Sequence, residues 1–143
     1  MEMRPFKPFG SVSALTLGGG GLGQIWGQTS REEAVATARM AVDCGITHFD
    51  MAPMYGRGEA ERVIGEAFKG ADTSKFHFTT KYRLGHVHQA ITYDKLNASP
   101  TRSLATIGIE RADLFFLHSP LIEHGHVLHQ LDEHRDRLAT PLS

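Results

Sequence analysis

The fold can be predicted outward from one stretch of the chain, Gly45-Ile46-Thr47-His48-Phe49-Asp50-Met51-Ala52-Pro53-Met54-Tyr55-Gly56. Residues 46–50 form a short run that contains Ile46 and Phe49 and is bounded by turn-forming residues, which is typical of a β-strand. Gly45 suits the end of a preceding helix. Apolar residues at helical spacing follow the loop from residue 59 onward. A helix, a strand, a loop and another helix in this order predict one unit of a parallel α/β sheet.

Two later segments repeat the strand signal, at residues 76–81 and 113–118. Both are rich in Phe, Leu or Thr without clean alternation, as expected where helices cover a sheet. Each of the three strands is expected to end on an ionisable side chain, and a tyrosine lies in the loop after the first. The carboxyl ends of parallel strands meet where α/β folds place their chemistry, so we expect one site there. The four residues of this site are Asp50, Tyr55, Lys81 and His118.

The segments between the strands predict helices. Ser30-Arg31-Glu32-Glu33 fits a capping box, which begins a helix that Gly45 can end. A second helix is expected over residues 59–69. Near the N-terminus, residues 4–10 and 11–17 predict two short strands joined as a hairpin. The order of elements predicts an α/β fold of about four βα units preceded by this hairpin.

Two helical segments are less regular. Residues 93–107 have helical spacing, but a proline inside a helix removes a backbone donor and crowds the preceding turn. We therefore expect a break at Pro100, with Ser99 as the N-cap of a new helix. Residues 121–143 predict one more helix in a tail without a further strand signal.

A glycine run, Gly18-Gly19-Gly20-Gly21-Leu22-Gly23, follows the first strand signal after the hairpin turn. It satisfies the G-x-G-x-x-G pattern of dinucleotide-binding crossovers, in which a helix must begin within the motif. Residues 25–29 intervene before the capping box, so a glycine-rich loop that lines the mouth of the sheet is the favoured interpretation. Trp26 in this region could anchor the loop or form a wall of a substrate pocket.

Bulk properties exclude several classes of protein. The chain has 143 residues and a net charge of −1, which suits one domain and argues against a nucleic-acid binder. No apolar run reaches the roughly 20 residues that span a membrane, and no signal-peptide core is present, so a cytoplasmic protein is expected. The single cysteine, Cys44, excludes an internal disulfide and predicts a buried structural thiol. No metal site is expected from the tail histidines, His124, His126, His129 and His134.

The quoted motifs resemble the aldo-keto reductase family over roughly residues 4–120. The stretch 45–56 and its continuation 58–65 are similar to the signature around the family's catalytic Asp and Tyr. Residues 79–81 are similar to its lysine strand, and residues 103–118 resemble its second signature and histidine strand. Residues 1–143 are therefore expected to form a single, partial domain of this family, with a divergent tail from residue 121.

The resemblance implies a (β/α)₈ barrel of the TIM type, here truncated to about four βα units with an N-terminal hairpin. It implies hydride transfer between NADP(H), with NAD(H) as the alternative, and an aldehyde, ketone or alcohol. Tyr55 would be the general acid, Lys81 and Asp50 would tune it, and His118 would orient the carbonyl. The resemblance places the cofactor at Gly20, Gly21, Leu22 and Asp50, and the substrate pocket at Trp26, Tyr55 and His118.

The chemistry of such a site is reasonable without the resemblance. A free phenol has a pKa of about 10, and a neighbouring ammonium favours the phenolate. At about 4 Å and an effective dielectric of about 20, that attraction is on the order of 4 kcal/mol before desolvation. A positioned general acid contributes about 10²–10⁴ in rate. A neutral histidine can donate one hydrogen bond to a carbonyl oxygen.

The length of the chain leaves alternatives open, since a full barrel has typically about 250 residues. The chain could be an oxidoreductase completed by a partner or a second copy. It could also be a truncated, inactive relative, or a binding or regulatory subunit. The strands near residues 13–18 and 113–118 would be unpaired on their outer sides, and unpaired edges favour self-association. We therefore expect association through these edges.

Overall fold

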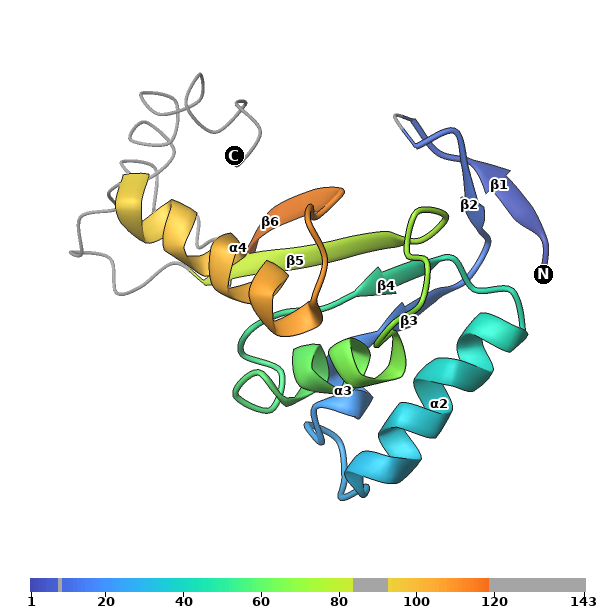
Figure 1. Ribbon diagram of the computed structural model, residues 1–143, viewed down its shortest axis with the longest axis horizontal. Helices are drawn as coiled ribbons and strands as arrows, with labels where there is room; N and C mark the ends of the chain where they lie inside the picture. Colours follow the sequence, from blue (N-terminus) through green and yellow to red (C-terminus); the bar gives the residue numbers. More distant parts are fainter. Residues whose placement is uncertain (8, 84–92, 119–143) are drawn as a thin grey trace.

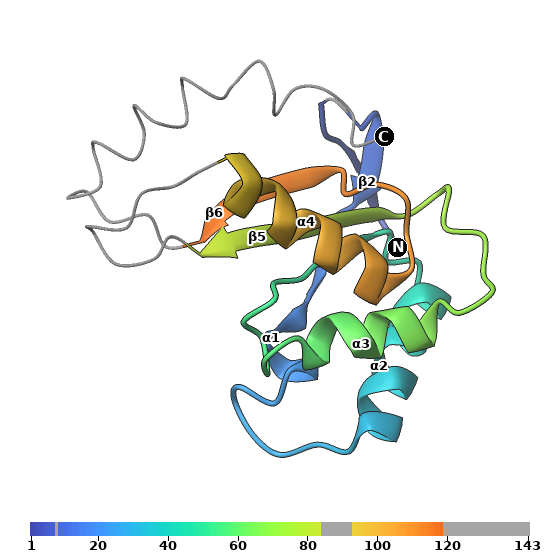
Figure 2. The same cartoon turned by 60° about the vertical axis from the view of Figure 1, so that its left-hand side comes forward.

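The computed structural model describes residues 1–7, 9–83 and 93–118 (Figure 1). Its centre is a parallel sheet with the strand order β3-β4-β5-β6, and an antiparallel hairpin, β1-β2, precedes it. Helices α2, α3 and α4 lie on one face of the sheet in both views (Figure 2). No helix in these ranges is long and apolar enough to cross a membrane. The elements are β1 (Met3–Pro5), β2 (Ser11–Ser13), β3 (Thr16–Gly18), α1 (Gly19–Leu22), α2 (Arg31–Asp43), β4 (His48–Asp50), α3 (Glu59–Ala67), β5 (His77–Arg83), α4 (Tyr93–Ile107) and β6 (Leu114–His118).

The core between sheet and helices is built on four phenylalanines. Phe49 at the centre of β4 is fully buried, and its ring lies 5.1 Å from the ring of Phe68, 5.9 Å from that of Phe76 and 5.7 Å from that of Phe78. Most of these contacts are edge-to-face, which aromatic rings favour over direct face-to-face stacking. The side chain of Phe49 faces the helices, so its neighbours His48 and Asp50 face the opposite side of the sheet.

The hairpin was predicted with a single second strand over 11–17, and this is wrong. The segment divides into β2 and β3, with a break at residues 14–15. The break follows from a reciprocal pair of hydrogen bonds: the Ser13 backbone N–H donates to Thr47 Oγ1 at 2.9 Å, and the Thr47 N–H donates to Ser13 Oγ at 2.9 Å. The Ser13 hydroxyl also donates to the Leu15 carbonyl at 2.6 Å, which turns the chain toward the main sheet.

The capping box that predicts α2 is confirmed. The Glu33 N–H donates to Ser30 Oγ at 3.1 Å, and the Ser30 N–H donates to Glu33 Oε2 at 2.9 Å. Gly45 follows the end of the helix with a φ of +82°, as a helix-stopping glycine does. Cys44 is exposed, so the prediction of a buried thiol is wrong. It caps the carboxyl end of α2, where the chain has already left the buried face.

The predicted break at Pro100 is also wrong. One continuous helix, α4, runs through Pro100, and Ser99 lies within it. Pro100 is buried against the rest of the domain, so packing offsets the backbone donor that it lacks. In the same turn the Thr101 hydroxyl donates to the Asn97 carbonyl at 2.8 Å. The predicted tail helix of residues 121–143 and the tail histidines lie outside the described residues.

The two edges of the described sheet are β3 and β6. Along β6 the side chains of Leu114, Phe116 and His118 share one face, which is the face of Lys81 in the neighbouring strand. Phe116 is 46% exposed there. Among the described residues, the face of the sheet that turns away from the helices therefore carries an exposed apolar ring beside this edge.

Candidate active site

The carboxyl end of the sheet collects the side chains that the sequence singles out. β4 ends at Asp50 and β6 ends at His118, but β5 continues past Lys81 to Arg83. The prediction that Lys81 closes its strand is wrong, because Tyr82 and Arg83 still pair with β6. Lys81 nevertheless shares one face and one end of the sheet with Asp50.

Lys81 is the centre of the site. Its side chain is mostly buried, and its ammonium donates to Asp50 Oδ1 at 2.6 Å and to the Met51 carbonyl at 2.9 Å. A buried ammonium needs such acceptors, because leaving water without them is costly. Lys81 Nζ lies 5.0 Å from the centre of the Tyr55 ring. The ion pair therefore holds a positive charge directly beside the tyrosine.

Tyr55 also contacts His118. The two rings meet edge to face, with centroids 5.6 Å apart and planes at 88°. Burial lowers the pKa of the His118 imidazole, and the cations Lys81 and Arg83 lower it further, against a weaker opposite effect of Asp50. The neutral imidazole is thus favoured at neutral pH, with one nitrogen as donor and one as acceptor. The structure brings all four predicted residues together.

A layer of polar side chains lies next to the site on the same face of the sheet. His48, two residues before Asp50 on the same face, hydrogen-bonds to Thr16 Oγ1 at 3.0 Å and to Thr79 Oγ1 at 2.7 Å. These bonds link β3, β4 and β5 side by side. Burial is the main cause that lowers the pKa of the His48 imidazole, which favours its neutral form. A structural role for His48 agrees with these contacts.

A second buried group holds β5 against the helices. The Thr80 hydroxyl, next to Lys81, donates to Glu61 Oε1 at 3.0 Å and lies 3.2 Å from Ser103 Oγ. Burial raises the pKa of the Glu61 carboxyl, although the hydroxyls of Ser103 and Thr80 act in the opposite direction. The strand that carries Lys81 is therefore fixed to both α3 and α4 by polar contacts as well as by apolar packing.

Comparison with known proteins identifies the family. The family model described as Aldo/keto reductase family matches residues 14–136, which is most of the chain. The chain belongs to the aldo/keto reductase family. The resemblance that the motifs suggested is thereby confirmed.

Individual relatives show how much of an aldo-keto reductase is present. L-galactose dehydrogenase of Arabidopsis thaliana is 28% identical over 128 residues, which are 87% of this chain and 40% of the plant protein. A crystal structure of a thermostable aldo-keto reductase with the inhibitor epalrestat has a TM-score of 0.72 and 26% identity, covering 96% of this chain and 51% of that one. A crystal structure of an aldo-keto reductase from Klebsiella pneumoniae in complex with NADPH has a TM-score of 0.66 and 26% identity. The match covers 92% of this chain and 45% of that one.

The chain thus spans about half, or less, of the length of these aldo-keto reductases. Its parallel strands and helices correspond to part of their (β/α)₈ barrel, which confirms the predicted fold class. The site at the carboxyl ends of the strands lies where barrel enzymes place their chemistry.

The glycine run does not form the open loop that was expected. Residues 19–22 make a single helical turn, α1. The side chain of Leu22 is in the core, and a Cβ atom on Gly20 would lie 2.7 Å from the Trp26 ring. Trp26 therefore packs on Gly20, although the residue is 80% exposed overall. Of the three cofactor residues predicted in this run, Gly20, Gly21 and Leu22, only Gly21 has open space beside it. A Cβ atom there would meet no heavy atom within 4 Å from the rest of the described structure.

Several residues near the site were not predicted from the sequence. A pocket of about 280 Å³ opens beside Lys81 and His118. Arg83 was missed because the strand was expected to end two residues earlier, although its period-two relation to Lys81 was a usable signal. The Met51 carbonyl gives no signal, since every residue has one. The remaining residues that line this pocket are Pro53, Met54, Tyr82 and Ser99.

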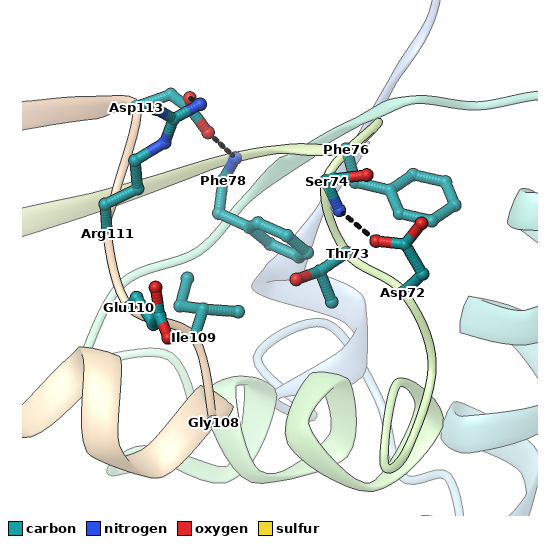
Figure 3. Close-up of a pocket in the computed structure, with 10 residues that line it drawn as sticks. All are labelled: Asp72, Thr73, Ser74, Phe76, Phe78, Gly108, Ile109, Glu110, Arg111 and Asp113. Atoms are coloured by element: carbon teal, nitrogen blue, oxygen red, sulfur yellow. Dashed lines mark hydrogen bonds and ion pairs between the residues drawn. The ribbon is translucent and has the colours of Figure 1, made fainter.

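A larger pocket, of about 500 Å³, lies at the opposite end of β5 and β6 (Figure 3). Two of the carboxylates that line this pocket accept hydrogen bonds from the backbone. Asp113 Oδ2 accepts from the Phe78 N–H at 2.9 Å, and Asp72 Oδ1 accepts from the Ser74 N–H at 2.9 Å. These bonds fix the loops that enter the strands. Among the described residues no group of three or more His, Cys, Asp or Glu side chains could hold a metal ion. We therefore assign the carboxylates at this end of the sheet a role in stabilising the fold.

Proposed function

We propose that the chain carries the acid–base half of an NAD(P)H-dependent oxidoreductase that reduces aldehydes or ketones, or oxidises the corresponding alcohols. The observation that carries this proposal is the contact of Lys81 Nζ with both Asp50 and the ring of Tyr55. A phenol beside a buried ammonium is suited to proton exchange, because the cation stabilises the phenolate that remains after the proton leaves. Membership of the aldo/keto reductase family supports the same chemistry.

Each of the four residues has a distinct part in this proposal. Tyr55 donates its hydroxyl proton to the carbonyl oxygen during reduction and takes it back in the reverse direction. Lys81 stabilises the phenolate, and Asp50 holds the ammonium in place. His118, as a neutral imidazole, donates a hydrogen bond that orients the carbonyl.

A nicotinamide cofactor, when bound, would supply the hydride. Asp50 fits such a group, since its side chain is 32% exposed and a carboxylate has acceptor capacity beyond the one bond to Lys81. Gly21 offers open space for a close approach to the backbone. Gly20 and Leu22 could take part only through their backbone atoms, because Trp26 covers the first and the core contains the side chain of the second.

Titration with NADPH, followed by nicotinamide fluorescence, tests the proposal. We expect a saturable change in fluorescence and, with a small aromatic aldehyde present, consumption of NADPH at 340 nm. A parallel titration with NADH decides the cofactor preference. Binding without turnover would favour a binding subunit, and neither binding nor turnover would favour an inactive relative.

We also propose that the chain associates with itself through the edge of β6. Edge strands present unpaired backbone groups, and Phe116 exposes an apolar ring beside this edge. Sedimentation velocity over a range of concentrations should show a species larger than the monomer, and Phe116→Glu should shift it toward the monomer. A monodisperse wild-type monomer at every concentration would contradict this part of the proposal.

A further inference from the structure

The backbone of Tyr55 is held at both of its polar groups. Its N–H donates to the Ala52 carbonyl at 3.0 Å, and its carbonyl accepts from the Ala60 N–H at 3.2 Å in the first turn of α3. The position of the phenol therefore depends on how α3 begins. Any displacement of that first turn would be passed to Tyr55 through a single hydrogen bond.

The turn between Tyr55 and α3 has an uncommon backbone conformation. Gly56, Arg57 and Gly58 have φ values of +61°, +54° and +85°, which are all in the left-handed region. A residue with a side chain, such as Arg57, adopts this region rarely. Three such residues in succession need support from the surrounding structure.

One side of this support comes from Gly23, the residue that caps the end of α1. A Cβ atom on Gly23 would lie 2.6 Å from the Tyr55 carbonyl carbon, and one on Gly56 would lie 2.3 Å from the Gly23 carbonyl oxygen. The two backbones are thus in direct contact, which only glycine at both positions allows. This contact limits movement of the turn toward α1.

The other side is a cluster of three charged residues at the start of α2 and α3. Glu59, the first residue of α3, accepts two hydrogen bonds of 2.7 Å from Nε and Nη2 of Arg31, the first residue of α2. It also accepts from Arg62 Nε at 3.0 Å, and Arg62 Nη2 donates to the Arg57 carbonyl at 3.2 Å. A chain of contacts therefore runs from α2 through Glu59 and Arg62 into the left-handed turn.

The contacts in this cluster are expected to be stronger than an ordinary ion pair on the surface, because of their geometry and the burial of Glu59. The Arg31–Glu59 contact is bidentate, which adds directional specificity to the charge. The Glu59 side chain is only 15% exposed, although both arginines are about half exposed. The Arg31 hydrogen bonds, helped by Arg62, hold the pKa of the Glu59 carboxyl below its usual value, against the opposite effect of burial.

We propose that Arg31, Glu59 and Arg62 form a clamp that positions Tyr55 for proton transfer. The three are positioning residues, since they act on Tyr55 through the left-handed turn and the first turn of α3. The role in proton transfer rests on the function proposed above. The mechanical link from the clamp to Tyr55 does not, and it can be measured separately.

The test uses the full chain and aromatic NMR, with the three tyrosines assigned by Tyr→Phe variants. In Glu59→Gln we expect the Tyr55–His118 nuclear Overhauser contact to weaken and the Tyr55 ring resonances to shift, while those of Tyr82 stay in place. Hydrogen exchange at the Ala60 amide should accelerate at least about tenfold, because local opening of the turn becomes easier. Arg31→Lys keeps the positive charge but loses the pair of parallel hydrogen bonds to Glu59, so it should give a smaller change of the same kind.

The matched control is Arg39→Met, on the same helix as Arg31. The Arg39 guanidinium reaches a backbone carbonyl, that of Glu66, at 3.5 Å and lies outside the clamp. The Arg39→Met substitution should leave the Tyr55 resonances and the hydrogen exchange of the Ala60 amide unchanged. Wild-type signals in Glu59→Gln, or equal changes in Arg39→Met, would overturn the clamp. If Glu59→Gln does not fold, Arg31→Lys decides by the same signals. Full carbonyl reduction in a Tyr55→Phe variant would instead overturn the proposed function and leave the clamp standing.

Discussion

Replacing Tyr55 with phenylalanine is expected to lower the rate of carbonyl reduction by about 10²–10⁴-fold, the usual contribution of a positioned general acid. The change removes one hydroxyl and keeps the ring. The edge-to-face contact with His118 and the contact of the ring with Lys81 should therefore survive. Steady-state NADPH consumption with an aldehyde measures the effect on turnover.

Two measurements separate this effect from a loss of structure. The affinity for NADPH, from the fluorescence titration, should stay within about twofold, because the hydroxyl is proposed to act on the carbonyl oxygen and not on the cofactor. The midpoint of thermal unfolding should also change little. A variant with full activity would show that another group supplies the proton.

Replacing Phe49 with alanine is expected to destabilise the domain by about 3–5 kcal/mol, as for other large-to-small changes of buried aromatic residues. Phe49 is fully buried and contacts the rings of three other phenylalanines, so its removal leaves a cavity between the sheet and α3. Urea unfolding followed by circular dichroism measures the loss. A variant that is unfolded in buffer agrees with it, because whole domains have only about 5–15 kcal/mol of stability.

The chain contains a matched control for this substitution. Phe6→Ala removes the same ring from a position that is 42% exposed just after β1, away from the edge of β6, so it should cost much less than Phe49→Ala. Phe49→Leu should lie between the two, since it fills part of the cavity. Equal losses in the two alanine variants would mean that the phenylalanine cluster is not the centre of the core.

Much of the fold could be predicted because its signals are local. The capping box at Ser30 and Glu33, the stop at Gly45 and the strand, predicted at residues 46–50 and observed at 48–50, involve residues within a few positions of one another. Their conformations depend on backbone propensity and on the period of apolar residues. The failures have non-local causes: the predicted break at Pro100 ignored tertiary packing, and the single strand over 11–17 ignored a hydrogen bond between Ser13 and the distant Thr47.

The sequence by itself determined the alternation of helices and strands from residue 30 to residue 118, the four polar residues near the carboxyl ends of strands, and the family. It could do so because strand ends and motif spacing are properties of contiguous residues. Only the tertiary structure decided that Lys81 is shared between Asp50 and the Met51 carbonyl, that Trp26 covers Gly20, and that Arg31 reaches Glu59 across 28 positions. These contacts depend on how separate segments pack in three dimensions, and they leave no periodic pattern in the sequence, so their geometry follows from folding alone.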